Sequence, residues 1–465
     1  MPESHSNVAV ITRVTNVRQH PNADRLKLAT ALGFTVVVGL EIKENDLGLF
    51  FNEGLQLSDQ FCLVNGLYPR LDDQGRRVGG GFFDPKNRRV RAQGFRGEKS
   101  EGFWCPISYL NGLLFREVVD NLKEGDQFTE LNGVQICCKY ETQATKDAAA
   151  KGAKTGTAAK KHQFFREHAD TKQLAYEIKR IPVGSVIHIS EKLHGTSGRY
   201  AFFREDQGYK SWIAKWLTIF AIWFQARFWN RKPTWTEKKL LVGSRRVQLK
   251  SQVSSTSFYG DESFRFAVAK KLEGNIRLGE TIYGELVGYQ GPNTPIMGRV
   301  ETSQLADKEF KKTYGDTMTY KYGCPEGTSR FFVYRITQTN EDGHVVELTV
   351  PQMKARCEVL GLDYVPEFSG PLVVVPGDPN MEAMGITFPL ICGHATGHLQ
   401  SLEKLVETFL DGPSTLDSSH IREGVVVRVD APDGTTYFLK QKSFEFRVLE
   451  GIVKDTGAID LEECS

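Results

Sequence analysis

The stretch VIHISEKLHGTS, residues 186–197, places one lysine at the end of an expected strand. Apolar and polar residues alternate over 186–189, which is typical of a β-strand. Lys192 follows, and Gly195 indicates a tight turn after it. A lysine placed this way can point its amine into a pocket and act as a nucleophile. A solvated surface lysine is the ordinary alternative for so short a pattern, so its meaning depends on the rest of the chain.

The composition is that of an ordinary soluble globular protein, with 40% hydrophobic and 25% charged residues. A chain of 465 residues can bury at least two hydrophobic cores, and we expect two or three domains. The net charge is only +2, so any basic surface for nucleic acid must be local.

The cysteines exclude two kinds of site. None of the eight forms a C-x-x-C pair, so zinc spacing and a redox motif are both lacking. Buried or free thiols in a reducing compartment are the expected state. Residues 1–7 are polar and lack the apolar core of a signal peptide, so we expect a cytoplasmic protein.

Residues 143–162 are rich in Ala, Lys, Thr and Gly and lack apolar periodicity, which predicts a flexible linker. It would separate a first domain, residues 1–142, from a second, residues 163–465. Short strand-like runs in the first domain predict a small β-barrel. The second domain alternates strands with helices expected at 264–272 and 399–409, an α+β pattern of mainly antiparallel sheets with flanking helices.

The segment at residues 212–229 carries aromatic residues at three- and four-residue spacing, which favours an amphipathic helix. Its apolar run is too short to span a bilayer. Packing on the protein is the favoured role, and contact with a membrane surface or a partner is the alternative.

The first domain also carries features of an RNA-binding module. The segment HPNADRL, residues 20–26, resembles the signature of tRNA-binding OB modules and reads as a turn leading into a strand. Further on, basic side chains are interleaved with aromatic ones, which suits binding to phosphates and bases. The alternative is that the aromatic residues are core and the charges solvated. The RNA-binding candidates are Arg88, Arg89, Arg91, Arg96 and Lys99.

Five further segments follow Lys192 in order: VGSRR (242–246), IYGEL (282–286), FFVYRI (331–336), REGVVVR (422–428) and YFLKQKS (437–443). Each alone has an ordinary structural explanation. Together they offer a nucleophilic amine, acids for metal and ribose, an aromatic face for adenine and cations for a triphosphate. That set suits an enzyme that transfers a nucleotide to its own lysine.

In these segments the chain resembles the covalent nucleotidyltransferase superfamily of polynucleotide ligases and capping enzymes. With His194 after the lysine and the HPNADRL segment, it is similar to the ATP-dependent RNA ligases with an N-terminal OB domain. The resemblance implies an OB-like barrel joined to a nucleotidyltransferase domain. It also implies ATP and Mg²⁺ or Mn²⁺ as cofactors and RNA 3′-OH and 5′-phosphate ends as substrate. The protein is then expected to be a monomer without a membrane span, acting in RNA repair.

The resemblance implies a role for each catalytic residue. Lys192 becomes lysyl-AMP, and Glu423 orients the hydrated metal, with Glu285 as a second acid near it. Lys440 and Lys442 hold the α-phosphate and the leaving pyrophosphate. Cations near Lys192 would also disfavour its protonated form, which is a poor nucleophile.

The resemblance likewise implies the nucleotide contacts. Glu285 binds the ribose hydroxyls and Tyr334 stacks on adenine. Arg245 contacts a phosphate, with Arg246 as the alternative if the register differs by one. The remaining candidates shape the nucleophile loop and the nucleotide site, and they are Glu191, His194, Gly195 and Thr196.

One position departs from the family pattern, since Arg335 stands where these ligases often carry Asp. We interpret that position as structural. Two rivals stay open: a DNA ligase or capping-type guanylyltransferase, and a non-catalytic RNA-binding protein. The presence of His194 disfavours the first, and the joint presence of Lys192 and Glu423 disfavours the second.

Overall fold

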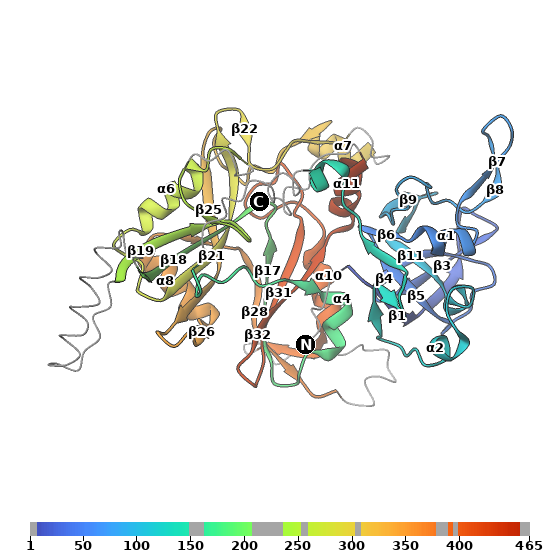
Figure 1. The fold of residues 1–465 in the computed structure, drawn as a ribbon, viewed down its shortest axis with the longest axis horizontal. Coiled ribbons are helices and arrows are strands. Elements are labelled where there is room, and N and C mark those ends of the chain that lie inside the picture. The colour runs from blue at the N-terminus through green and yellow to red at the C-terminus, as the bar shows by residue number, and fades with distance from the viewer. Residues whose placement is uncertain are drawn as a thin grey trace, which may run out of the picture.

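The computed structural model describes residues 7–147, 162–206, 236–252, 259–302, 308–377, 389–393 and 399–455. The linker expected at 143–162 and the aromatic segment at 212–229 lie largely or wholly outside the described residues. Strands dominate the described part, and helices cover the sheets (Figure 1).

The N-terminal part contains two main sheets. A four-stranded sheet has the order β11-β5-β1-β12 and a three-stranded sheet the order β2-β3-β4. Their strands are β1 (Ala9–Arg13), β2 (Thr15–Gln19), β3 (Leu26–Ala31), β4 (Phe34–Gly39), β5 (Leu47–Asn52), β11 (Gly102–Pro106) and β12 (Gln127–Phe128). These bounds confirm that the first domain contains several short strands, as its strand-like runs predicted. The barrel closure of this part and the domain boundaries remain predictions.

Short elements complete this part. They are β6 (Leu55–Leu57), α1 (Asp59–Val64), β7 (Pro69–Leu71), β8 (Arg77–Gly80), β9 (Gln93–Phe95), β10 (Glu98–Ser100), a 3-10 helix (Ile107–Leu110), α2 (Arg116–Asp120), β13 (Glu130–Leu131), β14 (Val134–Gln135) and β15 (Cys137–Lys139). The β7–β8 hairpin projects from the body of the protein (Figure 1).

A seven-stranded sheet carries Lys192, in the order β16-β32-β31-β17-β28-β29-β30. Its strands are β16 (Lys172–Gln173), β17 (Val186–Lys192), β28 (Glu367–Val375), β29 (Leu390–Gly393), β30 (Leu399–Ser401), β31 (Gly424–Asp430) and β32 (Thr436–Lys442). Apolar side chains such as Ile187, Ile189 and Val427 are fully buried in its core. The run expected over 186–189 is therefore a strand, and it continues to Lys192.

The second large sheet has the order β20-β19-β18-β21-β25-β26, with β22 and β27 beside it. Its strands are β18 (Thr196–Asp206), β19 (Thr236–Gly243), β20 (Gln248–Leu249), β21 (Glu280–Gly291), β22 (Thr294–Pro295), β25 (Ser329–Thr339), β26 (Val345–Glu347) and β27 (Asp363–Tyr364). Pairing in the two large sheets is antiparallel except for β16 with β32 and β25 with β27. The α+β pattern of mainly antiparallel sheets is confirmed for the described residues.

The helices here are α4 (Leu174–Glu177), a 3-10 turn (Ile178–Arg180), α6 (Ser263–Leu272), α7 (Lys308–Tyr314), α8 (Val350–Leu360), α10 (Leu402–Leu410) and α11 (Phe444–Asp455); β23 (Val300–Glu301) and β24 (Thr317–Met318) form a small pair. Helix α8 begins with a capping box, in which the side chains of Thr349 and Gln352 each accept a hydrogen bond from the backbone N–H of the other residue. It ends at Gly361, whose φ is 64°. The helix expected at 399–409 begins later, because residues 399–401 pair as β30. Helix α11 was not foreseen.

Helix α11 lies between the N-terminal part and the second part (Figure 1). Its Arg447 is 3% exposed and lies 3.2 Å from Glu53 of the N-terminal part, and it also contacts Glu101. The same guanidinium lies over the Phe34 ring. Because these partners lie about 350 to 400 residues earlier in the sequence, the two parts are held together by buried charges as well as by apolar packing.

Candidate active site

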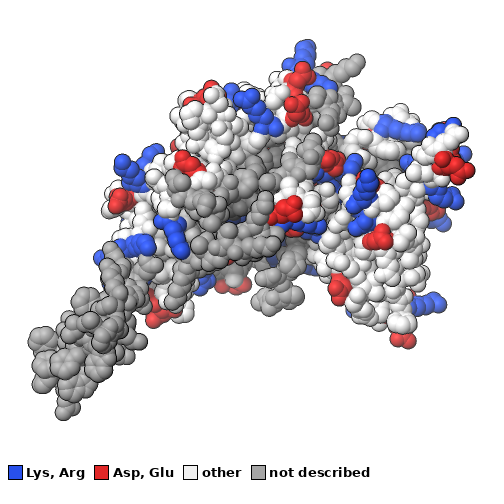
Figure 2. All heavy atoms as spheres, turned by 45° about the horizontal axis from the view of Figure 1, so that its top comes forward, with Lys and Arg blue, Asp and Glu red and all other residues white. Residues whose placement is uncertain are grey.

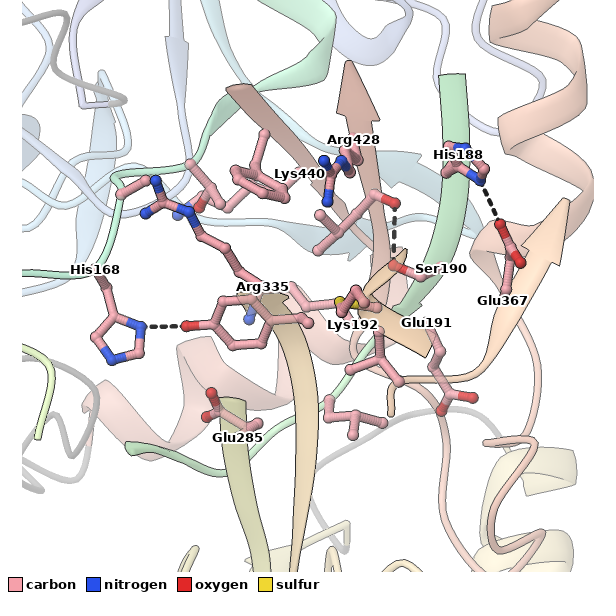
Figure 3. A pocket seen from close by; sticks show the side chains of 18 of the residues that line it. His168, His188, Ser190, Glu191, Lys192, Glu285, Arg335, Glu367, Arg428 and Lys440 are labelled. Carbon is pink, nitrogen blue, oxygen red and sulfur yellow. Dashed lines mark hydrogen bonds and ion pairs between the residues drawn. The ribbon is translucent and has the colours of Figure 1, made fainter. Parts of the chain in front are cut away.

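A cavity of about 160 Å³ lies where the two large sheets meet. Strands β17, β28, β31 and β32 of one sheet and β21 and β25 of the other contribute to its wall, together with α8 (Figure 3). Among the predicted site residues, those that line the cavity are Glu191, Lys192, Gly195, Arg245, Glu285, Tyr334 and Lys440. Residues from five separate sequence segments therefore share one cavity.

Lys192 ends β17 beside a fully buried carboxylate. Its Nζ lies 2.7 Å from Oε1 of Glu423, which is 0% exposed. Lys442 lies 3.4 Å from the same oxygen, and Nδ1 of His194 lies 3.7 Å from Oε2. A buried carboxylate among three basic groups is stable as an anion, because an unpaired buried charge would be very costly. The nucleophile and metal candidates of the sequence are thus in direct contact.

The loop after Lys192 is fixed by buried aromatic groups. The backbone N–H of His194 donates to the Tyr322 hydroxyl at 2.6 Å, and the His194 ring meets Tyr320 and Phe446 edge-on. A Cβ at Gly195 would come within 2.3 Å of the Leu286 carbonyl oxygen, so this close approach requires glycine. The loop is therefore held in one position beside Glu423.

Glu191 points to a different partner. It is 1% exposed, and its Oε2 accepts a hydrogen bond from the Thr415 N–H at 3.0 Å and another from the Thr415 hydroxyl. Although it lines the cavity, Glu191 also ties β17 to the segment that leads to Glu423.

The opposite wall carries Glu285 on β21 and Tyr334 on β25. The register of these strands shifts between Tyr283 and Gly284, which pair with Arg335 and Val333, so Tyr334 is an extra residue in a β-bulge. Bulges redirect a side chain and are common beside active sites. Here the bulge directs the Tyr334 ring into the cavity.

The Tyr334 hydroxyl contacts Nδ1 of His168, which lies in the segment before β16 (Figure 3). Burial and then nearby arginines, beginning with Arg199, hold the pKa of His168 well below its ordinary value. Burial and then Glu285 hold the pKa of Tyr334 well above its ordinary value. Both shifts favour the neutral imidazole and the protonated phenol, which share this hydrogen bond.

Two arginine expectations can be compared with the structure. Arg245 lines the cavity and lies 3.1 Å from Asp170, whereas Arg246 is exposed and outside the cavity. Arg335 forks onto Glu347, with Nε at 2.9 Å and 3.0 Å from the two carboxylate oxygens, and stacks on Tyr283. The geometry favours Arg245 over Arg246 as the phosphate ligand. It also gives Arg335 a structural partner.

The basic cluster of the N-terminal part faces α11 to a large extent. Arg89 is buried, and it donates to the Gly451 carbonyl at 2.9 Å and to Asp455 at 3.0 Å. Arg91 also approaches Asp455, and Lys99 lies over the Phe444 ring. The expectation that Arg89 contacts RNA is therefore corrected, because a buried guanidinium with a carboxylate partner is not available to a phosphate.

The other two predicted RNA-binding residues, Arg88 and Arg96, do not contact α11 in the described interactions. Arg88 donates to the Leu57 and Pro85 carbonyls, and Arg96 is exposed beside Asn22. Phe83 and Trp104 are buried, so part of the aromatic set is core, as the structural alternative stated. On the face shown in Figure 2, basic and acidic side chains are interspersed.

Several residues that line the cavity were not among the predicted site residues. His168 lies outside every recognised segment, and His188, Lys354, Glu367 and Arg428 also line the cavity. His188 lies four positions before Lys192 on β17, so strand periodicity would have pointed to it, whereas the position of Arg428 follows from its pairing with His188. Lys354 and Glu367 reach the cavity only through tertiary contacts.

Some features are not found in the described part of the chain. The described residues hold no group of three or more His, Cys, Asp or Glu side chains arranged to bind a metal. The described cysteines are all free thiols. Within the same ranges, no helix is long and apolar enough to cross a membrane.

Comparison with known proteins adds to this geometry. Solved structures of Naegleria gruberi RNA ligase share the fold. A mutant with ATP and Mn aligns at a TM-score of 0.54 and 15% identity, covering 94% of this chain and 98% of that chain. Another mutant with AMP and Mn aligns at 0.55 and 16%, covering 94% and 97%. No curated protein matches this chain. The family model "RNA ligase" matches residues 185–442, which hold all the motif segments and most of the cavity wall. The chain belongs to the RNA ligase family.

Proposed function

We propose that this protein is an ATP- and divalent-metal-dependent RNA ligase that joins RNA 3′-OH ends to 5′-phosphate ends in RNA repair. The observation that carries the proposal is the contact of Lys192 with the buried Glu423, beside the cavity that Lys192, Glu285, Tyr334 and Lys440 line. The Naegleria ligase structures with ATP and Mn support the choice of nucleotide and metal.

In the first step, the neutral amine of Lys192 attacks the α-phosphorus of ATP. An N–P bond forms, the bond from that phosphorus to the bridging oxygen breaks, and pyrophosphate leaves with the electron pair. The ammonium must lose its proton before attack, and the Glu423 carboxylate, 2.7 Å from Nζ, is the base within reach to accept it. Lys442, which shares the Glu423 oxygen, disfavours a second positive charge at that point. Lys440, on the cavity wall, would neutralise charge that develops on the phosphate.

The remaining cavity residues would hold the nucleotide. Glu285 would accept hydrogen bonds from the ribose hydroxyls, and the ring of Tyr334 would stack on adenine, with its hydroxyl anchored by His168. Arg245 would contact a phosphate, and that phosphate would compete with Asp170 for the guanidinium.

The donor set fits a magnesium or manganese ion held mainly through water. Glu423 offers one fully buried carboxylate, and Mg²⁺ typically binds through one or two carboxylates plus substrate phosphates and waters. Glu423, which contacts Lys192, would hold the ion, and Glu285 on the cavity wall would be the second acid. When bound, the ion would supply positive charge to the reacting phosphate.

The later steps need RNA. AMP passes from Lys192 to the 5′-phosphate of RNA, and the 3′-OH then attacks the activated phosphate and releases AMP. Residues 1–142 would form the OB-like module that grips the RNA, with Arg91, Arg96 and Lys99 as the exposed cations of the predicted set. We also propose that the protein is monomeric and cytoplasmic.

Labelled nucleotide tests this proposal. Purified protein is incubated with α-³²P-ATP and Mg²⁺ and then denatured, beside Lys192→Ala and the exposed-lysine control Lys312→Ala. The proposal predicts label on wild type and on the control but not on Lys192→Ala, and transfer of the label to 5′-phosphorylated RNA. Label from GTP in preference to ATP would instead identify a capping-type enzyme. Absence of label from folded protein that pyrophosphate has stripped of AMP would contradict an enzyme altogether.

A further inference from the structure

The register of three strands divides the cavity wall into rows. Strand β17 pairs with β31 and β31 with β32, all antiparallel. The rows are Lys192, Gly424 and Lys442; Ser190, Val426 and Lys440; and His188, Arg428 and Phe438. At about 3.3 Å per residue, the third row lies about 13 Å from the first. A nucleotide that lay along these rows with its phosphorus at Lys192 would have its base near the third row.

The third row holds a buried donor. The Arg428 side chain is 6% exposed. Its Nε lies 3.0 Å from Asp430, and its Nη2 donates to the Leu348 carbonyl at 2.7 Å. Its Nη1 is buried and finds no hydrogen-bond partner among the described residues. Buried donors are almost always satisfied, and Arg428 is one of the residues that line the cavity, so a bound ligand is a candidate acceptor for this nitrogen.

An acceptor lies on the same side of the cavity. Oε1 of Glu367, on β28, lies 2.6 Å from Nδ1 of His188, and Oε2 contacts Lys354. A carboxylate offers about four lone-pair sites, so capacity remains after these contacts. His188 is the cross-strand neighbour of Arg428, and Figure 3 shows His188, Glu367 and Arg428 grouped on one side, away from Glu285 and His168.

We propose that Glu367 and Arg428 read the hydrogen-bonding edge of the nucleotide base and set the preference of this enzyme for adenine. This inference rests on the proposed function. Adenine carries an amino donor beside ring-nitrogen acceptors. Glu367 accepts from the 6-amino group, and Nη1 of Arg428 donates to a ring nitrogen that flanks it, N1 or N7. Phe438 and Met353 give the base apolar contact.

Nucleotide analogues test each contact separately. Lysyl-nucleotide formation is measured with ATP, with purine riboside triphosphate, which lacks the 6-amino group, and with ATP analogues that carry carbon in place of N1 or N7. Each is offered to wild type, Glu367→Met, Glu367→Gln and Arg428→Met. The readout is the rate ratio of ATP to analogue within each variant, so a general loss of folded protein cancels.

For Glu367 we expect wild type to prefer ATP over purine riboside triphosphate by roughly 10- to 100-fold, the range for a hydrogen bond to a charged group. Glu367→Met should reduce this ratio to within a few-fold of one. Glu367→Gln keeps an acceptor oxygen and should be intermediate. For Arg428 we expect one of the two ring-nitrogen analogues to be poor for wild type and as good as ATP for Arg428→Met.

The control variant is Asp363→Asn, whose carboxylate pairs with Arg330 at 3.0 Å outside the cavity wall. It should keep every wild-type ratio. Ratios that are near one in wild type, or unchanged in Glu367→Met and Arg428→Met, would overturn the inference while leaving ligase function intact. A wild-type protein that no nucleotide labels would instead overturn the proposed function itself.

Discussion

Two segments differ in how far their role can be inferred from their own sequence. One is the strand that ends at Lys192, and the other is the basic stretch of residues 86–99. Along β17 the functional residues recur on alternate positions, and the neighbouring strands supply their partners in register. In the basic stretch, the partner of Arg89 is Asp455, which lies 366 residues further on. A function carried by a strand is thus readable from its own periodicity, whereas the fate of a charge cluster depends on what packs against it.

The largest effect is expected at the site that strand β17 carries. Glu423→Gln removes the charge shared by Lys192 and Lys442. We expect lysyl-AMP formation to fall by roughly 100- to 1,000-fold, as when one preorganised electrostatic group is lost from an active site. Single-turnover labelling with α-³²P-ATP measures it. The matched control is Glu450→Gln, whose carboxylate lies 2.9 Å from Lys442, and it should lose far less. Equal losses in the two variants would contradict a central role for Glu423.

The next prediction concerns the contacts that helix α11 makes with residues far away in the sequence. Arg447→Met leaves Glu53 and Glu101 buried without their cation, so the free energy of unfolding should fall by about 3–5 kcal/mol. Urea denaturation measures this fall. Arg204→Met, which breaks an exposed pair with Glu341, should lose at most about 1 kcal/mol. Similar losses in the two variants would show that the α11 contacts do not hold the parts together.

A smaller effect separates two arginines of the basic stretch. Arg96 is exposed, so Arg96→Ala should weaken RNA binding and reduce the slope of log affinity against log salt by about one. Arg89→Met should leave that slope unchanged, because its guanidinium is bound to α11. Filter binding across a salt series measures both slopes. A reduced slope for Arg89→Met alone would reverse the assignment.

The smallest effect is in pH dependence. The folded-state pKa of His168 lies well below its ordinary 6.5, chiefly because of burial. The unfolded chain therefore binds the proton more readily, and stability falls as pH drops below about 6.5. His168→Asn should make this fall shallower by at most about 1.4 kcal/mol per pH unit. Denaturation between pH 7 and pH 5 measures the slope, and an unchanged slope would contradict a buried neutral His168. Some dependence will persist, since burial also lowers the pKa of His420.

The sequence predicted most of what lies on strands. The segments at 186–197, 282–286, 331–336 and 437–443 all contribute to one cavity, because each combines strand periodicity with a reactive side chain at a strand end or bulge. Tyr334 was located, although the bulge that directs it inward was not. Such a bulge depends on the register with β21.

The rest depended on tertiary packing. The partner of Tyr334, His168, lies 166 residues away in a segment without regular structure. The pairing of His188 with Glu367 joins strands 179 residues apart. Helix α11 was not predicted, because its amphipathic face is explained only by packing against the N-terminal part, where Arg447 is buried. The sequence of each of these segments, taken alone, does not predict such contacts.

The most direct test of the central claim is to locate AMP on the protein. Wild-type protein is incubated with ATP and Mg²⁺, digested under conditions that preserve phosphoramidates, and its peptides are mapped by mass spectrometry. The account predicts one AMP adduct, on Lys192, which disappears when pyrophosphate or 5′-phosphorylated RNA is added. AMP on another lysine, such as Lys440 or Lys442, or no adduct at all on folded protein, would contradict it.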